Sequence, residues 1–126
     1  GSTDSRIRQS LALQDKVRSD LENSRRQAAL SARQSYLGVT NGMAQVKALE
    51  AAEASTKLAL EATQLGYKVG VRVNLDVLNS QTQLFQTQRD LAKARYDVLL
   101  GHLKLKQVTG VLQADDLQQI SQSLAP

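Results

Sequence analysis

The stretch that decides the fold is Gly66-Tyr67-Lys68-Val69-Gly70-Val71-Arg72-Val73-Asn74-Leu75-Asp76-Val77-Leu78-Asn79. It is the one clear break between two long segments rich in good helix formers. A short break between two long helices indicates an antiparallel helical hairpin whose tip lies at this stretch. We expect the tip to be the part that touches partners.

The composition favours an extended helical assembly over a compact globule. Aromatic residues make up 3% of the 126 residues, and there is no tryptophan. Large aromatic side chains supply much of the apolar area of globular cores, so this chain lacks their contribution. Its only proline is the last residue, Pro126, and an interior without proline permits long helices.

The residues give no support for catalysis or for a bound cofactor. There is no cysteine, and His102 is the only histidine, so neither a thiolate site nor a histidine metal site is expected. No phosphate-binding or dinucleotide motif occurs. The net charge of +4 is spread along the chain, which is typical of a solvated helix surface and not of nucleic-acid binding. No apolar run is long enough for a membrane-spanning helix. We therefore predict no enzyme, no metal and no cofactor.

These patterns predict an all-α fold: a long antiparallel α-helical hairpin, or coiled coil, with a short C-terminal helix. A glycine at 110 is expected to stop the second helix. Gly1-Ser2 is typical of a cloning scar, so we expect an excised piece of a longer protein. The expected segments are the scar 1–2, helix 3–65, tip 66–74, helix 75–109 and a short helical segment 110–126.

Two apolar stripes with seven-residue spacing run along the first helix. They lie about 200° apart, so this helix is predicted to be wedged between two neighbours. Glu53 interrupts the second stripe. The first stripe is Leu30, Leu37, Ala44, Ala51, Leu58 and Leu65; the second is Ala32, Val39, Val46 and Leu60.

The second helix carries three such stripes: Leu78, Phe85, Ala92 and Leu99; Val77, Leu84, Leu91, Val98 and Leu105; and Leu75, Thr82, Tyr96 and Leu103. A turn near Gly70 pairs positions whose numbers add to about 140. We predict that Ala44 packs against Tyr96 and Leu37 against Leu103 inside the hairpin. One apolar stripe would remain uncovered, and we expect self-association through it.

Two local features leave alternatives open. Gly38 and Gly42 form a G-x-x-x-G pattern, which indicates either close approach of a neighbouring helix or a weak turn at a bend. At the tip, Asn74 is a predicted N-cap, and Arg72 and Asp76 are four residues apart. That spacing fits a local ion pair with helix capping, or a polar ring or docking surface repeated in an oligomer.

The tip and the segment after it resemble the TolC-like outer membrane efflux protein family. The family pattern G-Y-x-V-G-T-R-T-x-x-D-V-L is similar to residues 66–78, and the resemblance continues through Arg89-Asp90-Leu91-Ala92 to Gly110-Val111-Leu112. It covers nearly the whole chain, and the tip is its most specific part. The chain is similar to the second periplasmic hairpin of that family.

The resemblance implies a segment of a periplasmic helical tunnel in a bacterial outer membrane channel. Three subunits would form the channel, which serves type I secretion or tripartite drug efflux. A periplasmic adaptor protein would dock at the tip, and an inner membrane transporter would act through that adaptor. The implied docking residues are Val69, Gly70, Val71 and Arg72; the implied pore gate is Arg72, Asp76 and Asn79.

The chain departs from the family pattern at two places. Val71 and Val73 stand where the family has threonines, which makes the tip more apolar, and Asn79 stands where some members have a second aspartate. The alternative interpretation is a generic helical-hairpin interaction module, spectrin-like or from an adaptor coiled coil.

Overall fold

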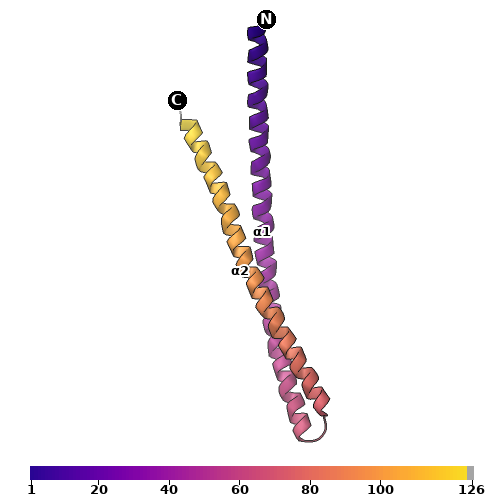
Figure 1. Ribbon diagram of the computed structural model, residues 1–126. Coiled ribbons are helices and arrows are strands. Elements are labelled where there is room, and N and C mark those ends of the chain that lie inside the picture. The colour runs from indigo at the N-terminus through magenta and orange to yellow at the C-terminus, as the bar shows by residue number, and fades with distance from the viewer. Residues whose placement is uncertain (125–126) are drawn as a thin grey trace. The chain divides into compact units, whose positions relative to one another are not determined.

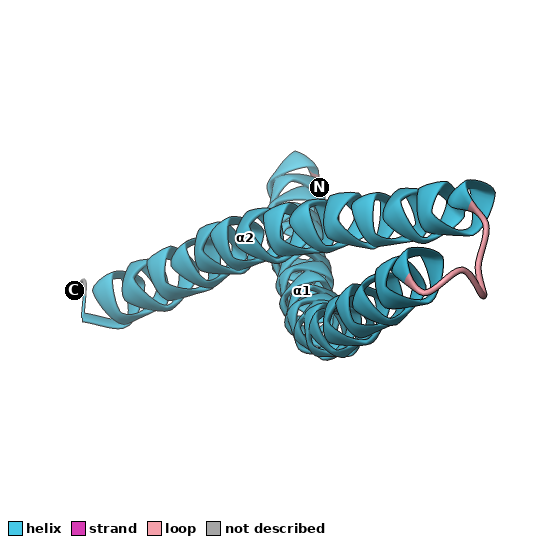
Figure 2. Cartoon of the chain, turned by 90° about the horizontal axis from the view of Figure 1, so that it is seen from below, coloured by secondary structure: helices cyan, strands magenta, loops and turns pink. Residues whose placement is uncertain are grey.

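A computed structural model describes residues 1–124, and these form two helices and no strand (Figure 1). Helix α1 spans Ser2–Lys68 and helix α2 spans Asn74–Leu124. Residues 69–73 form the connection, drawn as the loop in Figure 2. The predicted all-α helical hairpin is confirmed.

The helices belong to two compact units. The hairpin unit is Tyr36–Leu103, which holds the C-terminal part of α1, the tip and the first part of α2. The terminal unit combines Gly1–Ser35 with the part of α2 that begins at Lys104. Each unit is described separately below, and the tip belongs to the hairpin unit.

Helix α2 does not stop where the sequence predicted. It passes through Gly110 without interruption and reaches Leu124, so the expected separate C-terminal helix is a continuation of α2. One glycine inside a helix costs only about 1 kcal/mol relative to alanine. Val108 and Leu112 flank it as half-buried residues, and their packing offsets that cost. Ala125 and Pro126 of the expected segment lie outside the described residues.

The two helices of the hairpin unit meet along one seam, defined by its buried and half-buried residues. These residues alternate at spacings of three and four, the pattern of knobs-into-holes packing. On α1 the seam is Val39, Gly42, Val46, Leu49, Glu53, Thr56, Leu60 and Thr63; on α2 it is Val77, Ser80, Leu84, Thr87, Leu91, Ala94, Val98 and Gly101.

The predicted pairing was right about which positions of α1 and α2 lie at the same level of the hairpin. It was wrong about which side of each helix faces the other helix. Gly42 lies beside Val98 and Gly101 beside Val39, as a turn at Gly70 requires. Tyr96, expected inside the hairpin, is exposed together with its predicted neighbours. Tyr96 faces outward, whereas at the same level of the seam Gly42 and Gly101 let the helices approach closely.

Two glycines set how closely the helices approach. A Cβ added at Gly42 would lie 2.9 Å from Val98 Cγ2, and one added at Gly101 would lie 3.1 Å from Val39 Cγ2. A methyl group at either position would therefore push against the facing valine. A Cβ at Gly38 would meet nothing within 4 Å. Of the two interpretations of the G-x-x-x-G pattern, close approach holds for Gly42 and not for Gly38.

Two polar contacts also join α1 to α2 in the hairpin unit. Near the tip, the Ser80 hydroxyl donates a hydrogen bond to Thr63 Oγ1 at 3.2 Å. Farther along, Arg95 Nη2 lies 3.3 Å from Glu50 Oε1, in a pair whose side chains are both more than half exposed. Such an exposed pair adds little stability, so the apolar seam carries most of the hairpin's packing energy.

Among the residues of the terminal unit whose burial the structure describes, fewer are half-buried. Ala28 and Ala32 on α1, and Leu105, Val108 and Leu112 on α2, continue the seven-residue pattern. Residues 1–24 are exposed along their whole length, as expected for a segment without a partner in the chain. Within residues 1–124, no helical stretch combines the length and the apolarity that crossing a membrane requires.

Candidate functional site

Helix α1 ends at the tip in a Schellman motif. Gly70 has a φ of +86°, the left-handed conformation that glycine adopts without steric cost. The Val71 amide donates to the Gly66 carbonyl at 2.9 Å, and the Gly70 amide donates to the Tyr67 carbonyl at 3.2 Å. These two hydrogen bonds satisfy carbonyls that the end of a helix otherwise leaves unpaired. The tip backbone is therefore fixed by its own hydrogen bonds.

Gly66 makes room for Arg72. Gly66 is buried, and a Cβ added there would lie 2.7 Å from Arg72 Cγ and 3.4 Å from Arg72 Cβ. The Gly66 carbonyl also accepts a hydrogen bond from the Arg72 amide at 3.1 Å. The root of the Arg72 side chain thus lies against the last turn of α1, while the residue as a whole is exposed.

Helix α2 begins with a cap that Asp76 provides. The Val73 amide donates to Asp76 Oδ2 at 3.2 Å, and the Asp76 amide donates to the Val73 carbonyl at 3.0 Å. This is the backward-reaching half of a capping box, and it places the N-cap at Val73, one residue before the predicted Asn74. A carboxylate in the first turn also interacts favourably with the helix dipole.

The structure bears on the local interpretation of the Arg72 and Asp76 spacing, which combined an ion pair with helix capping. Capping is present, but within residues 1–124 no ion pair within 4 Å joins Arg72 to Asp76. Arg72 is an exposed residue of the connection. The Asp76 carboxylate is half-buried and already accepts a backbone hydrogen bond.

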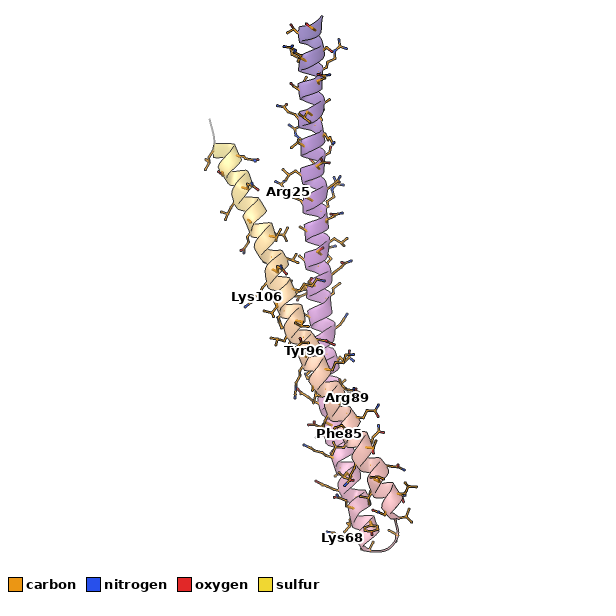
Figure 3. All side chains as sticks on the ribbon, in the orientation of Figure 1. Arg25, Lys68, Phe85, Arg89, Tyr96 and Lys106 are labelled. Carbon is orange, nitrogen blue, oxygen red and sulfur yellow. The ribbon has the colours of Figure 1, made fainter. Side chains whose placement is uncertain are left out.

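The predicted docking residues form an exposed, largely apolar surface. Val69, Val71 and the neighbouring Val73 are 66%, 75% and 62% exposed. Lys68, labelled at the tip in Figure 3, and Arg72 add two cations beside these valines. Three exposed valines within five residues of a rigid turn are a surface that gains free energy when a partner covers it.

The predicted gate residues lie on both sides of the start of α2. Arg72 belongs to the connection, whereas Asp76 and Asn79 are three residues apart on α2 and so share one helix face. Asn79 is exposed and carries no charge. The face therefore has one carboxylate.

Sequence reasoning missed three residues of the tip region. Gly66 makes room for Arg72, Val73 takes the N-cap position, and Ser80 bonds to α1. The signal for Gly66 was its position four residues before Gly70, the spacing that a Schellman motif gives between its first carbonyl and its left-handed residue. Nothing in the sequence pointed to Val73 as the N-cap, because valine is among the residues least favoured at that position.

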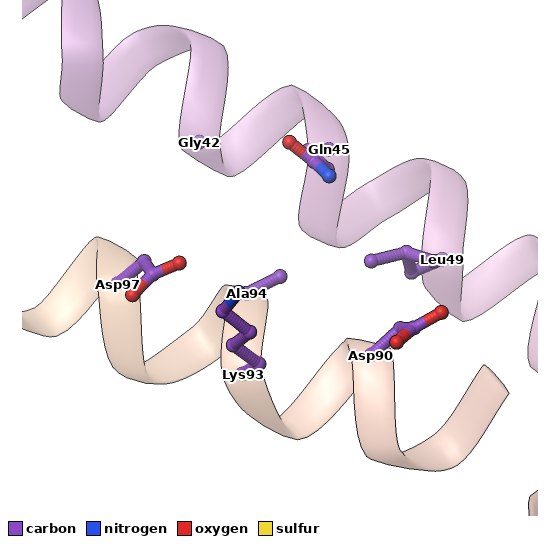
Figure 4. Close-up of a pocket in the computed structure, with 7 residues that line it drawn as sticks. All are labelled: Gly42, Gln45, Leu49, Asp90, Lys93, Ala94 and Asp97. Carbon is purple, nitrogen blue, oxygen red and sulfur yellow. The ribbon is translucent and has the colours of Figure 1, made fainter. Parts of the chain in front are cut away.

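A groove beside the seam is one of several concave features of the hairpin unit (Figure 4). It has a volume of about 240 Å³, and Gly42 is among the residues that line it. Asp90 and Asp97 line it from α2, seven residues and so about 10.5 Å apart. Within the described residues no three potential metal ligands gather, and the groove holds no histidine. The lining residues therefore indicate a polar surface and no particular reaction.

Comparisons with known proteins all point to one protein family. Residues 1–111 match the family model described as outer membrane efflux protein. The chain is 31% identical to the outer membrane protein TolC of Escherichia coli over 83% of this chain and 21% of that protein. It is 34% identical to the outer membrane protein TolC of Vibrio cholerae over 83% of this chain and 24% of that protein.

A further relative covers more of this chain. The alkaline protease secretion protein AprF of Pseudomonas aeruginosa is 31% identical over 96% of this chain and 25% of that protein. The chain thus spans about a quarter of the length of these relatives. Because the family model covers the tip and most of both helices, the chain belongs to the outer membrane efflux protein family.

Proposed function

We propose that this chain forms part of the wall of a periplasmic helical tunnel in a TolC-like bacterial outer membrane channel. The channel would be a passive export duct made of three subunits, serving type I secretion or tripartite drug efflux. The observation that carries the proposal is that both helices have a second apolar stripe left exposed outside the seam. A wall helix needs such a stripe because it has a neighbour on either side.

The tip is proposed as the docking point for a periplasmic adaptor protein, through Val69, Gly70, Val71 and Arg72. Support comes from the exposure of the valines and from the hydrogen bonds that hold the turn. A rigid turn loses little conformational entropy on binding. The partner should present an apolar socket with acidic groups near its rim, to match the two cations of the tip. An inner membrane transporter would act through that adaptor.

Docking can be tested on the exposed valines without disturbing the turn. We expect Val71→Asp to weaken binding of an adaptor hairpin at least about tenfold, since it puts a charge into an apolar contact. The measurement is titration calorimetry with the purified chain. Val17→Asp makes the same change at another exposed valine and should bind as wild type. Equal binding by Val71→Asp and wild type would remove the docking proposal.

The gate proposal assigns Arg72, Asp76 and Asn79 to the closed end of the channel. Asp76 both caps α2 and carries the charge, so two substitutions are needed to separate these effects. Asp76→Asn keeps an oxygen acceptor for the Val73 amide and removes the charge, whereas Asp76→Ala removes both.

The gate is tested by the conductance of the full-length channel in planar bilayers. Charge-based gating predicts that Asp76→Asn and Arg72→Ala both raise the closed-state conductance. If only Asp76→Ala raised it, the residue would act through the helix cap and its gate role would be rejected. Asp4→Asn changes the first turn of α1 in the same way and serves as the control.

A further inference from the structure

The seam of the hairpin unit consists of layers, in each of which one residue of α1 faces one residue of α2. Gly42 beside Val98 and Val39 beside Gly101 fix the register, because both pairs have numbers that add to 140. The same register along the rest of the seam gives two sets of layers. The inner layers are Val39 with Gly101, Gly42 with Val98, Val46 with Ala94 and Leu49 with Leu91; the tip layers are Glu53 with Thr87, Thr56 with Leu84, Leu60 with Ser80 and Thr63 with Val77.

The two sets of layers differ in chemistry. Among these described seam residues, the inner layers contain no polar side chain, whereas every tip layer contains at least one. The two buried apolar side chains of the hairpin unit, Val39 and Leu91, are 6% and 2% exposed and lie in the inner layers. The buried side chain of the tip layers is that of Thr87. Apolar burial therefore stabilises the inner layers more than the tip layers.

The hydroxyl groups of the tip layers do little to join the two helices. The hydroxyls of Thr56, Thr63 and Thr87 each donate to a backbone carbonyl of their own helix, at 2.9, 2.7 and 2.9 Å. Among the hydroxyls of the tip layers, that of Ser80 makes the one hydrogen bond across the seam, to Thr63 Oγ1 at 3.2 Å. The three threonine bonds persist when the helices move apart, so they do not oppose separation.

Glu53 weakens the layer that lies next to the inner set. Its side chain is 28% exposed, and its ion pair at 3.9 Å is with Lys57 of the same helix. Across the seam, the register places Glu53 opposite Thr87. A carboxylate that is partly withdrawn from water regains hydration when the helices separate. The boundary between the two sets of layers is therefore marked by a charge that favours the open form.

We propose that the tip layers open as a local unit of their own while the inner layers stay closed. The inner layers then hold α1 and α2 together, and the tip can change its direction relative to them without unfolding of the hairpin. This inference concerns contacts between the two helices of one chain, and it does not rest on the proposed export function.

Hydrogen exchange of the purified chain, followed by mass spectrometry of its peptides, tests this inference. Once the helices part, each tip segment of about ten residues is too short to remain a stable helix in water, so its amides exchange. After correction for intrinsic rates, amides of residues 53–63 and 80–87 should exchange at least about tenfold faster than those of residues 39–49 and 91–101.

Two matched substitutions distinguish local opening from unfolding of the whole hairpin. Leu84→Val and Leu91→Val make the same change seven residues apart, in a tip layer and in an inner layer. Leu91 keeps its contacts when only the tip layers open. Leu91→Val should therefore speed exchange of the inner-layer amides about fivefold and leave the tip-layer amides unchanged. Leu84 loses its contacts in both kinds of opening, so Leu84→Val should speed exchange of both sets.

Two outcomes would overturn the inference. Equal exchange of the two sets of amides in the wild-type chain would mean that the hairpin unit opens as one cooperative unit. Equal acceleration of both sets by Leu91→Val would mean the same. Circular dichroism of both variants should show the helix content of the wild-type chain. The adaptor titration examines the tip valines, so its result is independent of these outcomes.

Discussion

The seam and the outer faces of the hairpin unit, which are the helix surfaces turned away from the seam, use the same helices but different side chains. The seam contains Gly42 and Gly101, each beside a valine, and one fully buried leucine, Leu91. The outer faces hold the aromatic side chains Phe85 and Tyr96, and these are exposed. Close approach within the hairpin thus depends on two glycines, and the aromatic side chains face away from the seam.

The difference shows that side-chain size alone does not tell which stripe is internal. Small residues let two helix backbones approach closely, so more atoms of each helix come into van der Waals contact. Larger side chains would hold the helices apart. In this protein the exposed aromatic residues Phe85 and Tyr96 are therefore better placed toward a neighbour outside the hairpin, as the tunnel-wall proposal requires.

The largest expected effect comes from truncating the seam. Leu91→Ala should lower the free energy of unfolding by about 3 kcal/mol, because it removes a fully buried side chain and leaves a cavity. Phe85→Ala removes a larger side chain from the outer face and should cost less than about 0.5 kcal/mol in the dilute, monomeric chain. Urea unfolding followed by circular dichroism measures both. Equal costs would contradict the distinction between seam and outer face.

A smaller effect is expected from filling the seam. Gly42→Leu should destabilise the chain by about 2 kcal/mol, because the new side chain begins 2.9 Å from Val98 Cγ2. Gly38→Leu makes the same change four residues earlier, where nothing lies within 4 Å. There the better helix propensity should stabilise by up to about 1 kcal/mol. Thermal unfolding should thus shift in opposite directions, and shifts of the same sign would show that Gly42 is not a contact point.

The smallest effect is expected at the rim of the seam. Arg95 and Glu50 are both more than half exposed, so their coupling energy should be about 0.5 kcal/mol or less. A double-mutant cycle of Arg95→Ala and Glu50→Ala measures it. The coupling should fall further in high salt, because the pair is open to solvent. A coupling above about 2 kcal/mol would mean that the pair, and not the small residues, sets the register of the hairpin.

Much of the tip was predictable because its geometry is local. A glycine in the left-handed conformation ends a helix by rules that span six residues, and the sequence predicted the turn at Gly70. The exposure of Val71 follows from its place in a short connection. The role of Gly66 toward Arg72 was not predictable, because it depends on where the chain turns after leaving the helix. The N-cap at Val73 likewise needs the actual position of the Asp76 carboxylate.

The sequence by itself determined that this protein is all helical, that one break turns it back on itself, and that the turn lies at Gly70. These features depend on helix propensity, on the lack of an internal proline and on seven-residue periodicity, which are all short-range properties. Only the tertiary structure decided which stripe forms the seam and that α2 runs on through Gly110. The reason is physical: several stripes satisfy the same periodicity, and the fit of small residues against a facing helix selects among them.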